Sequence, residues 1–417
     1  MVTTRRFLCL LAVLLAPAGA FAQAPARKAV FIIVDGIPAD VIESVPTPHL
    51  DDIARAGGYT RAYTGGEAGG YSETPTISAV GYNSLLTGTW ANKHNVWGNG
   101  IKAPNYHYPT VFRLMKDQYP AKRTAIFSTW LDNRTKLVGE GLAATGNIRF
   151  DYHYDGFELD TVRFPHDTAR KFINDIDELV TNEAARYLAA EGPDLTWVYL
   201  EYTDDIGHRH GDGPEMTRAV EIADAQVGRI RQAVQRRARA HNEEWMILIT
   251  TDHGRDAATG RDHGGQSERE RTIWMTTNLP NLNAYFHNQQ PAMVDILPTI
   301  ARFMDFDVPH TELDGVPMVG PVSVIAPEIT RRGGEIEVTW TALDPSGSVK
   351  VKVSTTNHRQ HGRADDYRLV GTVPTGAETF TFDASALPSD FYKVMLEAPH
   401  NTVNRWLLAA PDETADY

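Results

Sequence analysis

Side chains able to bind metal recur at the ends of strand-like segments in this 417-residue sequence, as six acidic and histidine residues: Asp35, Asp204, His208, Asp252, His253 and His263. Three carboxylates and three imidazoles are enough ligands for two divalent ions, with coordination positions left open for a substrate. These ligand types suit zinc better than magnesium. The sequence therefore predicts a centre of two zinc ions, or of other divalent metals, that activates a nucleophile and stabilises a leaving group.

The spacing of these residues supports a shared centre. Asp204 and His208 are one helical turn apart, so both can reach one ion. Asp205 is the alternative ligand, because at three residues before His208 it could also face that ion. An acidic residue at a strand end is often only a helix cap or a turn former. Acidic residues at three successive strand ends are much harder to explain in that way.

Buried strands must hold these side chains in place. Strand-like apolar runs cover residues 28–34, 123–128, 195–201 and 245–250, and amphipathic helical patterns cover residues 167–190 and 214–240. This alternation predicts an α/β fold with a largely parallel central sheet covered by helices on both faces. The predicted ligands then lie just beyond the carboxyl ends of strands, where open α/β sheets bind ligands.

The pattern changes after Gly320 to six or seven short alternating strands separated by turns. This pattern predicts a small β-sandwich of the immunoglobulin or fibronectin-III type. The expected organisation is a signal peptide over 1–22, a metallohydrolase domain over 23–318 and a β-sandwich domain over 319–417. The sandwich contains no cluster of chemistry-capable residues, so a stabilising or spacing role is favoured over a dedicated binding role.

The amino-terminal segment indicates export. Arg5 and Arg6 precede a short apolar run, and Ala20-Phe21-Ala22 is a small-x-small cleavage pattern. No other segment approaches a continuous apolar membrane span, so we expect a periplasmic or secreted protein without a membrane anchor.

The formal net charge of the chain is -13, which disfavours long polyanionic partners such as a nucleic acid duplex.

A candidate nucleophile stands at the start of a polar-to-helical segment, 76–88. Ser78 occupies the expected N-cap position of that helix, and a plain capping serine is the structural alternative. A hydroxyl at a helix N-terminus beside a divalent cation is easily deprotonated, and the free N–H groups there can hold a phosphoryl oxygen. These properties indicate phosphoryl-transfer chemistry.

From residue 28 to about 317 the sequence resembles the alkaline phosphatase superfamily, and within it the nucleotide pyrophosphatase/phosphodiesterase branch, also called type I phosphodiesterases. In that branch the nucleophile stands ten residues before the glycine of a hydrophobic Thr-Gly motif, and counting back from Gly88 leads to Ser78. The segment 94–99 is similar to the branch's His-Gly-x-x-x-Asn element, which makes Asn99 the phosphate-binding residue.

The resemblance also implies a fold and a division of ligands. The fold is an alkaline-phosphatase-like α/β/α sandwich. One zinc is held by Asp204, His208 and His263, and the other by Asp35, Asp252 and His253 together with Ser78. The resemblance implies attack by Ser78 through a phosphoseryl intermediate, with the non-bridging oxygens held by Asn99 and the backbone N–H of Ala79.

The sequence departs from the branch after the nucleophile. Ser78-Ala79-Val80 stands where the branch commonly has threonine, an aromatic residue and proline. Maturation of a sulfatase requires proline and arginine at the second and fourth positions after the nucleophile, and the chain has Val80 and Tyr82 there. Formylglycine chemistry is therefore not expected.

A phosphodiesterase acting on a small phosphate ester is the favoured function, and two alternatives remain. The first is a phosphomonoesterase, because Arg134 or Lys136 could supply the extra cation that a monoester dianion needs. The second is a catalytically inactive secreted binding protein, which the complete ligand set argues against. The sequence indicates no particular protein partner.

Overall fold

The computed structural model describes residues 24–408, so the predicted signal peptide lies outside the described residues. The larger α/β part is built on a seven-stranded sheet with the order β2-β7-β6-β1-β5-β3-β4. Its strands are β1 (Ala26–Val34), β2 (Gly58–Tyr63), β3 (Thr124–Ser128), β4 (Tyr152–Tyr154), β5 (Leu195–Leu200), β6 (Glu243–Thr250) and β7 (Thr272–Thr277). The pairs from β6 through β4 are parallel, and β7 pairs antiparallel with β6 and β2. The predicted, largely parallel sheet is confirmed.

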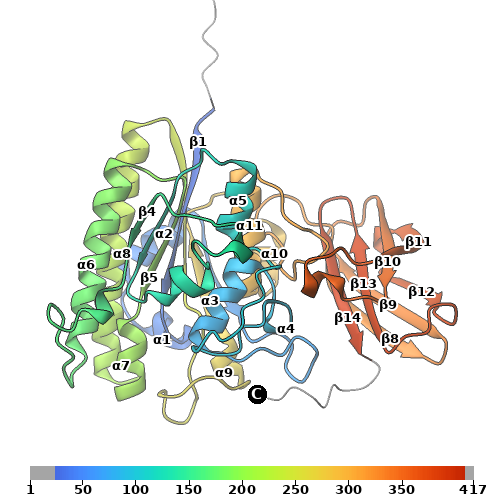
Figure 1. Ribbon diagram of the computed structural model, residues 1–417, viewed down its shortest axis with the longest axis horizontal. Helices are drawn as coiled ribbons and strands as arrows, with labels where there is room; N and C mark the ends of the chain where they lie inside the picture. Colours follow the sequence, from blue (N-terminus) through green and yellow to red (C-terminus); the bar gives the residue numbers. More distant parts are fainter. Residues whose placement is uncertain (1–23, 409–417) are drawn as a thin grey trace, which may run out of the picture.

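Helices cover both faces of this sheet (Figure 1). They are α1 (Ala39–Ser44), α2 (Pro48–Ala56), α3 (Ser78–Thr87), α4 (Ala91–His94), α5 (Val111–Gln118), α6 (Lys171–Ala190), α7 (Tyr202–His210), α8 (Pro214–Ala240), α9 (Glu268–Arg271), α10 (Ala284–Asn288) and α11 (Ile296–Met304). Helices α2, α6 and α8 share one apolar cluster with Val30 and Ile32 of β1, whereas α3, α5 and α11 share the other with Phe31 and Ile33. Burial on both faces explains why the strand reads as a continuous apolar run.

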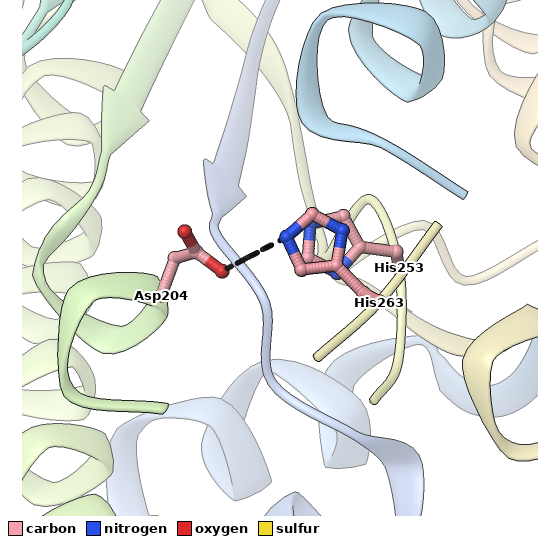
Figure 2. Close-up of side chains that lie close together, drawn as sticks. All are labelled: Asp204, His253 and His263. Atoms are coloured by element: carbon pink, nitrogen blue, oxygen red, sulfur yellow. Dashed lines mark ion pairs between the residues drawn. The ribbon is translucent and has the colours of Figure 1, made fainter. Parts of the chain in front are cut away.

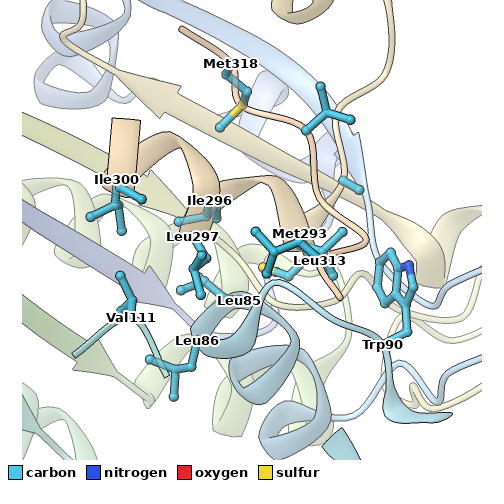
Figure 3. Packing of buried hydrophobic residues seen from close by; sticks show 14 of the residues in the cluster. Leu85, Leu86, Trp90, Val111, Met293, Ile296, Leu297, Ile300, Leu313 and Met318 are labelled. Atoms are coloured by element: carbon cyan, nitrogen blue, oxygen red, sulfur yellow. The ribbon is translucent and has the colours of Figure 1, made fainter. Parts of the chain in front are cut away.

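Helix α3 is fully enclosed, because all ten of its residues are buried. Leu85 and Leu86 lie against α11 near Ile296 and Leu297 (Figure 3). A Cβ atom added at Gly81 would lie 3.1 Å from Asp252, so the helix passes close to the end of β6. This packing fixes the start of α3 beside the carboxyl ends of the central strands.

The carboxyl-terminal part is a β-sandwich of two antiparallel sheets, β11-β10-β13-β14 and β12-β9-β8. The strands are β8 (Val324–Arg332), β9 (Glu335–Ala342), β10 (Ser348–Ser354), β11 (Arg368–Pro374), β12 (Thr379–Asp383), β13 (Phe391–Glu397) and β14 (Thr402–Leu408). The predicted sandwich is confirmed. Its first strand, β8, was not individually predicted, because Pro327 and a register shift before Glu328 interrupt its alternation.

The sandwich meets the α/β part through a buried polar contact. Lys93 of α4 donates to the Glu312 carbonyl at 2.8 Å, to Asp314 at 2.5 Å and to Asn404 of β14 at 2.9 Å. Lys393 of β13 lies 4.8 Å from the centre of the Trp406 ring, and Lys93 lies 5.6 Å from it. Both lysine side chains are almost fully buried.

None of the helices described between residues 24 and 408 has the length and apolar character that a membrane span requires.

Candidate metal centre

The sheet brings the predicted ligands together. Strand β1 lies between β5 and β6 with parallel register on both sides, so the residues that follow these three strands meet at one edge. Their ligand atoms form two groups, Asp35 with Asp252 and His253, and Asp204 with His253 and His263, and within each group the atoms lie within 4.8 Å of one another. Figure 2 shows the stacked rings of His253 and His263 facing Asp204.

Helix α7 places its two predicted ligands on the same side. The Nε2 atom of His208 lies 3.3 Å from Asp204 Oδ2 and 3.1 Å from His263 Nε2. The neighbouring Asp205 faces elsewhere, because both of its carboxylate oxygens accept hydrogen bonds of 2.8 Å from Arg170. Of the two acidic residues that the spacing allowed, Asp204 therefore faces the centre.

Two histidines are oriented by backbone carbonyls. The Nδ1 atom of His253 lies 2.9 Å from the Gly254 carbonyl, and Nδ1 of His263 lies 2.9 Å from the Thr76 carbonyl. A carbonyl accepts a hydrogen bond from a protonated Nδ1, so Nε2 keeps its lone pair for a metal. Burial lowers the pKa of His253 and of His263, which favours the neutral form that binds metal.

His208 differs from these two residues because it is more exposed and faces a carboxylate. Its hydrogen bond with Asp204 raises the pKa of His208. Burial alone would raise the pKa of Asp204, but the bond from His208 and the charge of Arg255 hold the pKa of that carboxyl below its ordinary value.

Asp35 and Asp252 form a buried pair of carboxylates. Tyr82 and Tyr199 donate their hydroxyls to Asp35 Oδ2, the latter at 2.7 Å, and the Gly36 N–H donates to Asp252 Oδ1 at 3.1 Å. The other oxygens, Asp35 Oδ1 and Asp252 Oδ2, are buried without a hydrogen-bond partner. Burial and mutual repulsion raise the pKa of Asp35, and burial raises the pKa of Asp252 to about 7. Two unpaired carboxylate oxygens beside an imidazole fit a divalent cation.

Ser78 is the first residue of α3, and the cap position belongs to Ile77, one residue earlier than expected. The Ser78 side chain makes no capping bond, and its Oγ lies 3.4 Å from His253 Nε2. The next backbone N–H, that of Ala79, donates to Asn99 Oδ1 at 3.0 Å. The structure thus brings Ser78, Ala79 and Asn99 together at the metal centre.

The two basic residues considered for a monoester are already paired. Arg134 donates to both oxygens of Asp155, at 2.6 and 2.9 Å, and also to Glu140. Lys136 lies 2.7 Å from Asp132, with 48% of its side chain exposed. The charge of Arg134 is therefore balanced by Asp155 and Glu140.

Sequence reasoning missed several residues that hold the ligands. Tyr82 and Tyr199 reach Asp35 from α3 and β5, and in the sequence each looks like an ordinary core residue. Arg255 contacts Asp204 and is completely buried. Its place directly after the Asp-His-Gly motif was the available signal for a basic partner of the ligands.

An open, largely parallel sheet that gathers carboxylate and imidazole side chains at the carboxyl ends of its strands is the arrangement expected of the alkaline phosphatase superfamily. The sequence profile described as "Type I phosphodiesterase / nucleotide pyrophosphatase" matches residues 29–299. The chain belongs to this family.

The chain is also similar to individual proteins. Human ectonucleotide pyrophosphatase/phosphodiesterase family member 7 is 27% identical over 261 residues, covering 58% of this chain and 52% of the relative. GPI ethanolamine phosphate transferase 2 of Candida albicans is 25% identical over 222 residues, covering 48% of this chain and 24% of the relative. The chain thus spans about half the length of the first relative and about a quarter of the second.

A solved structure shares the fold. That of a 2-O GAG sulfatase has a TM-score of 0.50 and 12% identity, covering 87% of this chain and 86% of the other. At this identity the likeness concerns the fold alone.

Proposed function

We propose that the chain is an exported hydrolase of phosphate diesters that holds two zinc ions and acts through a phosphoseryl intermediate. The observation that carries this proposal is the Ser78 hydroxyl, which makes no capping bond and lies 3.4 Å from the metal-binding nitrogen of His253. The proposal that the chain is exported rests on the sequence of residues 1–22.

The ligand division is the one that the family resemblance implies, and it is supported by the close grouping of Asp35, Asp252 and His253 and by the contacts of His208 with Asp204 and His263. Asp35, Asp252 and His253 would hold one ion together with Ser78, and Asp204, His208 and His263 would hold the other. When bound, the ions supply positive charge that lowers the pKa of a hydroxyl and stabilises a departing oxygen.

Ser78 performs the covalent chemistry. Its Oγ gives its proton to solvent water and attacks phosphorus in line, and the bond from phosphorus to the leaving oxygen breaks. The departing oxygen takes up a proton from water and leaves as an alcohol. The resulting phosphoseryl ester is then attacked by water, which releases the phosphate product and restores the Ser78 hydroxyl. Most of the acceleration would come from position and charge, because phosphoryl transfer demands little else of a site.

Asn99 holds a non-bridging oxygen of the phosphoryl group. Because its Oδ1 accepts the Ala79 N–H, its amide is fixed with the Nδ2 donors free for a substrate oxygen. The Ala79 N–H orients Asn99 through this bond. Direct donation from Ala79 to phosphate, as the resemblance implies, would require this N–H to be shared.

The pairing of Arg134 favours a diester. A monoester dianion carries one more negative charge, and a charge-assisted bond to it would contribute about 1.5–3 kcal/mol. Arg134 is committed to Asp155 and Glu140, and Lys136 is paired with Asp132. A diester monoanion has no need of this extra cation.

The test compares hydrolysis of bis(para-nitrophenyl) phosphate, para-nitrophenyl phosphate and para-nitrophenyl sulfate by zinc-loaded protein. We expect the diester rate to exceed the others. Ser78→Ala should abolish hydrolysis of both phosphates and leave the zinc content unchanged. Ser84→Ala is the matched control, because its hydroxyl lies in the same helix but donates to the Val80 carbonyl, and it should retain activity.

Two results would overturn the proposal. A preference for the monoester that is lost in Arg134→Ala would identify a phosphomonoesterase. Substantial activity of Ser78→Ala on either phosphate would exclude the covalent mechanism.

A further inference from the structure

One arginine lies inside the metal centre. Arg255 is among the largest side chains that are fully buried, with 0% exposure. Within residues 24–408, Asp204 is the one ligand carboxylate that pairs with an arginine or lysine, and Arg255 is its partner. Asp35 and Asp252 pair there only with His253.

The guanidinium of Arg255 joins three chain segments that carry ligands. Its Nε donates to the Gly36 carbonyl at 2.9 Å, directly after Asp35. Its Nη1 donates to the Arg261 carbonyl at 2.9 Å, two residues before His263. Its Nη2 donates to the Asp204 carbonyl at 2.8 Å and also to the Asp204 carboxylate.

Two glycines provide the space in which this guanidinium lies. A Cβ atom at Gly36 would approach Arg255 to 2.6 Å, and one at Gly207 would approach it to 2.2 Å. Gly36 also has a φ of +64°, a conformation that disfavours other residues. The backbone of these two glycines borders the niche on two sides and confines the guanidinium to one position.

We propose that Arg255 is a positioning residue that serves as a fixed cation of the metal centre. It holds Asp204 in its ligand position before metal binds, and it makes the two metal positions unequal. This inference rests on the proposed metal centre and concerns how that centre is assembled.

Charge explains both effects. The ligand cluster contains three largely buried carboxylates. Negative charges that lie close together in a buried cluster strongly repel each other unless a cation compensates them. Arg255 compensates Asp204. The Asp35 and Asp252 pair keeps two partnerless oxygens and has no lysine or arginine partner among the described residues. A divalent cation should therefore bind first at Asp35, Asp252 and His253, and second at the position that shares Asp204 with Arg255.

The test measures thermal unfolding of Arg255→Met with zinc bound and after removal of zinc by a chelator. Without Arg255, Asp204 loses its arginine counter-charge in both states, but only in the zinc-loaded protein does a metal ion replace that charge. We expect the melting temperature of the zinc-free variant to fall about 5 °C or more further than that of the zinc-loaded variant, each relative to wild type in the same state.

Arg237→Met is the matched control. Arg237 is also buried and ion-paired, but its partner is Glu243 and its other contacts are the carbonyls of Ala189 and Ala190. Its removal should lower the melting temperature equally in the two states. Equal losses for Arg255→Met would show that Arg255 contributes only packing, and would overturn the proposal. If Arg255→Met does not fold, Arg255→Lys keeps a cation but loses the forked geometry, and the same difference between states should be smaller but present.

A zinc titration of the zinc-free protein against a competing chelator tests whether the two metal positions differ in zinc affinity. We expect two binding steps that differ at least about tenfold in affinity, with Asp252→Asn removing the tighter step and Asp204→Asn the weaker. Two equal steps would refute the unequal positions. Absence of zinc binding would overturn the metal centre itself, which distinguishes the two failures.

Discussion

Exchange of Asp204 for asparagine tests the ligand assignment most sharply, because the adjacent Asp205 provides a matched control. The two carboxylates are equally exposed, at 14% of the side chain. They differ in their surroundings. Asp204 lies 3.3 Å from His208 and 3.9 Å from His263, whereas Asp205 is paired with Arg170, whose side chain is 38% exposed.

These surroundings set the expected magnitudes. Asp204→Asn removes an anionic ligand, which should weaken zinc binding at that position by at least the tenfold to hundredfold that loss of an outer-shell partner produces. It also leaves Arg255 buried without its counter-charge, which should lower the free energy of unfolding by about 3–5 kcal/mol. Asp205→Asn breaks a partly exposed pair, worth about 0–1 kcal/mol, and leaves the zinc ligands intact.

The assay measures zinc per chain after gel filtration, the rate of diester hydrolysis and urea unfolding for both variants. Asp204→Asn should retain about one zinc and lose most of its activity, whereas Asp205→Asn should match wild type in both. Equal losses of zinc in the two variants, or a larger loss in Asp205→Asn, would refute the assignment of Asp204 as the metal ligand of α7.

Three further outcomes are expected. His263→Ala should lower zinc content and diester rate together while circular dichroism shows an unchanged fold, and near-normal turnover would remove His263 from the ligand set. Chelation should abolish hydrolysis, and zinc should restore it better than magnesium does. Burial raises the pKa of Asp295 to about 7, so the folded chain keeps a proton that the unfolded chain releases near pH 4. Asp295 alone should therefore lower the free energy of unfolding by up to about 4 kcal/mol as pH rises from about 4 to about 7. Asp295→Asn cannot titrate, so in urea unfolding it should gain relative to wild type over this interval, and a constant difference would contradict the shift.

The fold could be predicted where local pattern and tertiary environment agree. Strands β1, β5 and β6 are buried on both faces, so their apolar runs indicate strands directly, and helix α8 covers the predicted residues 214–240. Strand β8 was missed because its proline and register shift remove the alternation on which the prediction depends.

The site was predictable as a set of ligand types but not as a geometry. The spacing allowed either Asp204 or Asp205 to be the metal ligand. The structure distinguishes them because Asp205 is paired with Arg170, which lies more than thirty residues earlier in the sequence. The partners of Arg255 are mainly backbone carbonyls, which have no signature in the residue types. Side chains that hold a ligand through the backbone are therefore the part of a site that a single sequence conceals.

The two lysines buried around Trp406 affect whether the α/β part and the sandwich can dissociate after proteolysis, and whether one part can be replaced during evolution. Lys393 of the sandwich lies 3.8 Å from Glu312 of the α/β part, while Lys93 of the α/β part uses Asn404 of the sandwich. If a proteolytic cut near residue 320 let the pieces part, Lys93 would keep Asp314 and Lys393 would keep Asp365, but Lys93 would lose Asn404 and Lys393 would lose Glu312. These shared buried contacts favour pieces that stay together and melt as one cooperative unit. For the same reason, a foreign sandwich could not simply be grafted in its place. Residues on both sides of the contact would have to change at once, so these two parts are expected to have diversified as a pair.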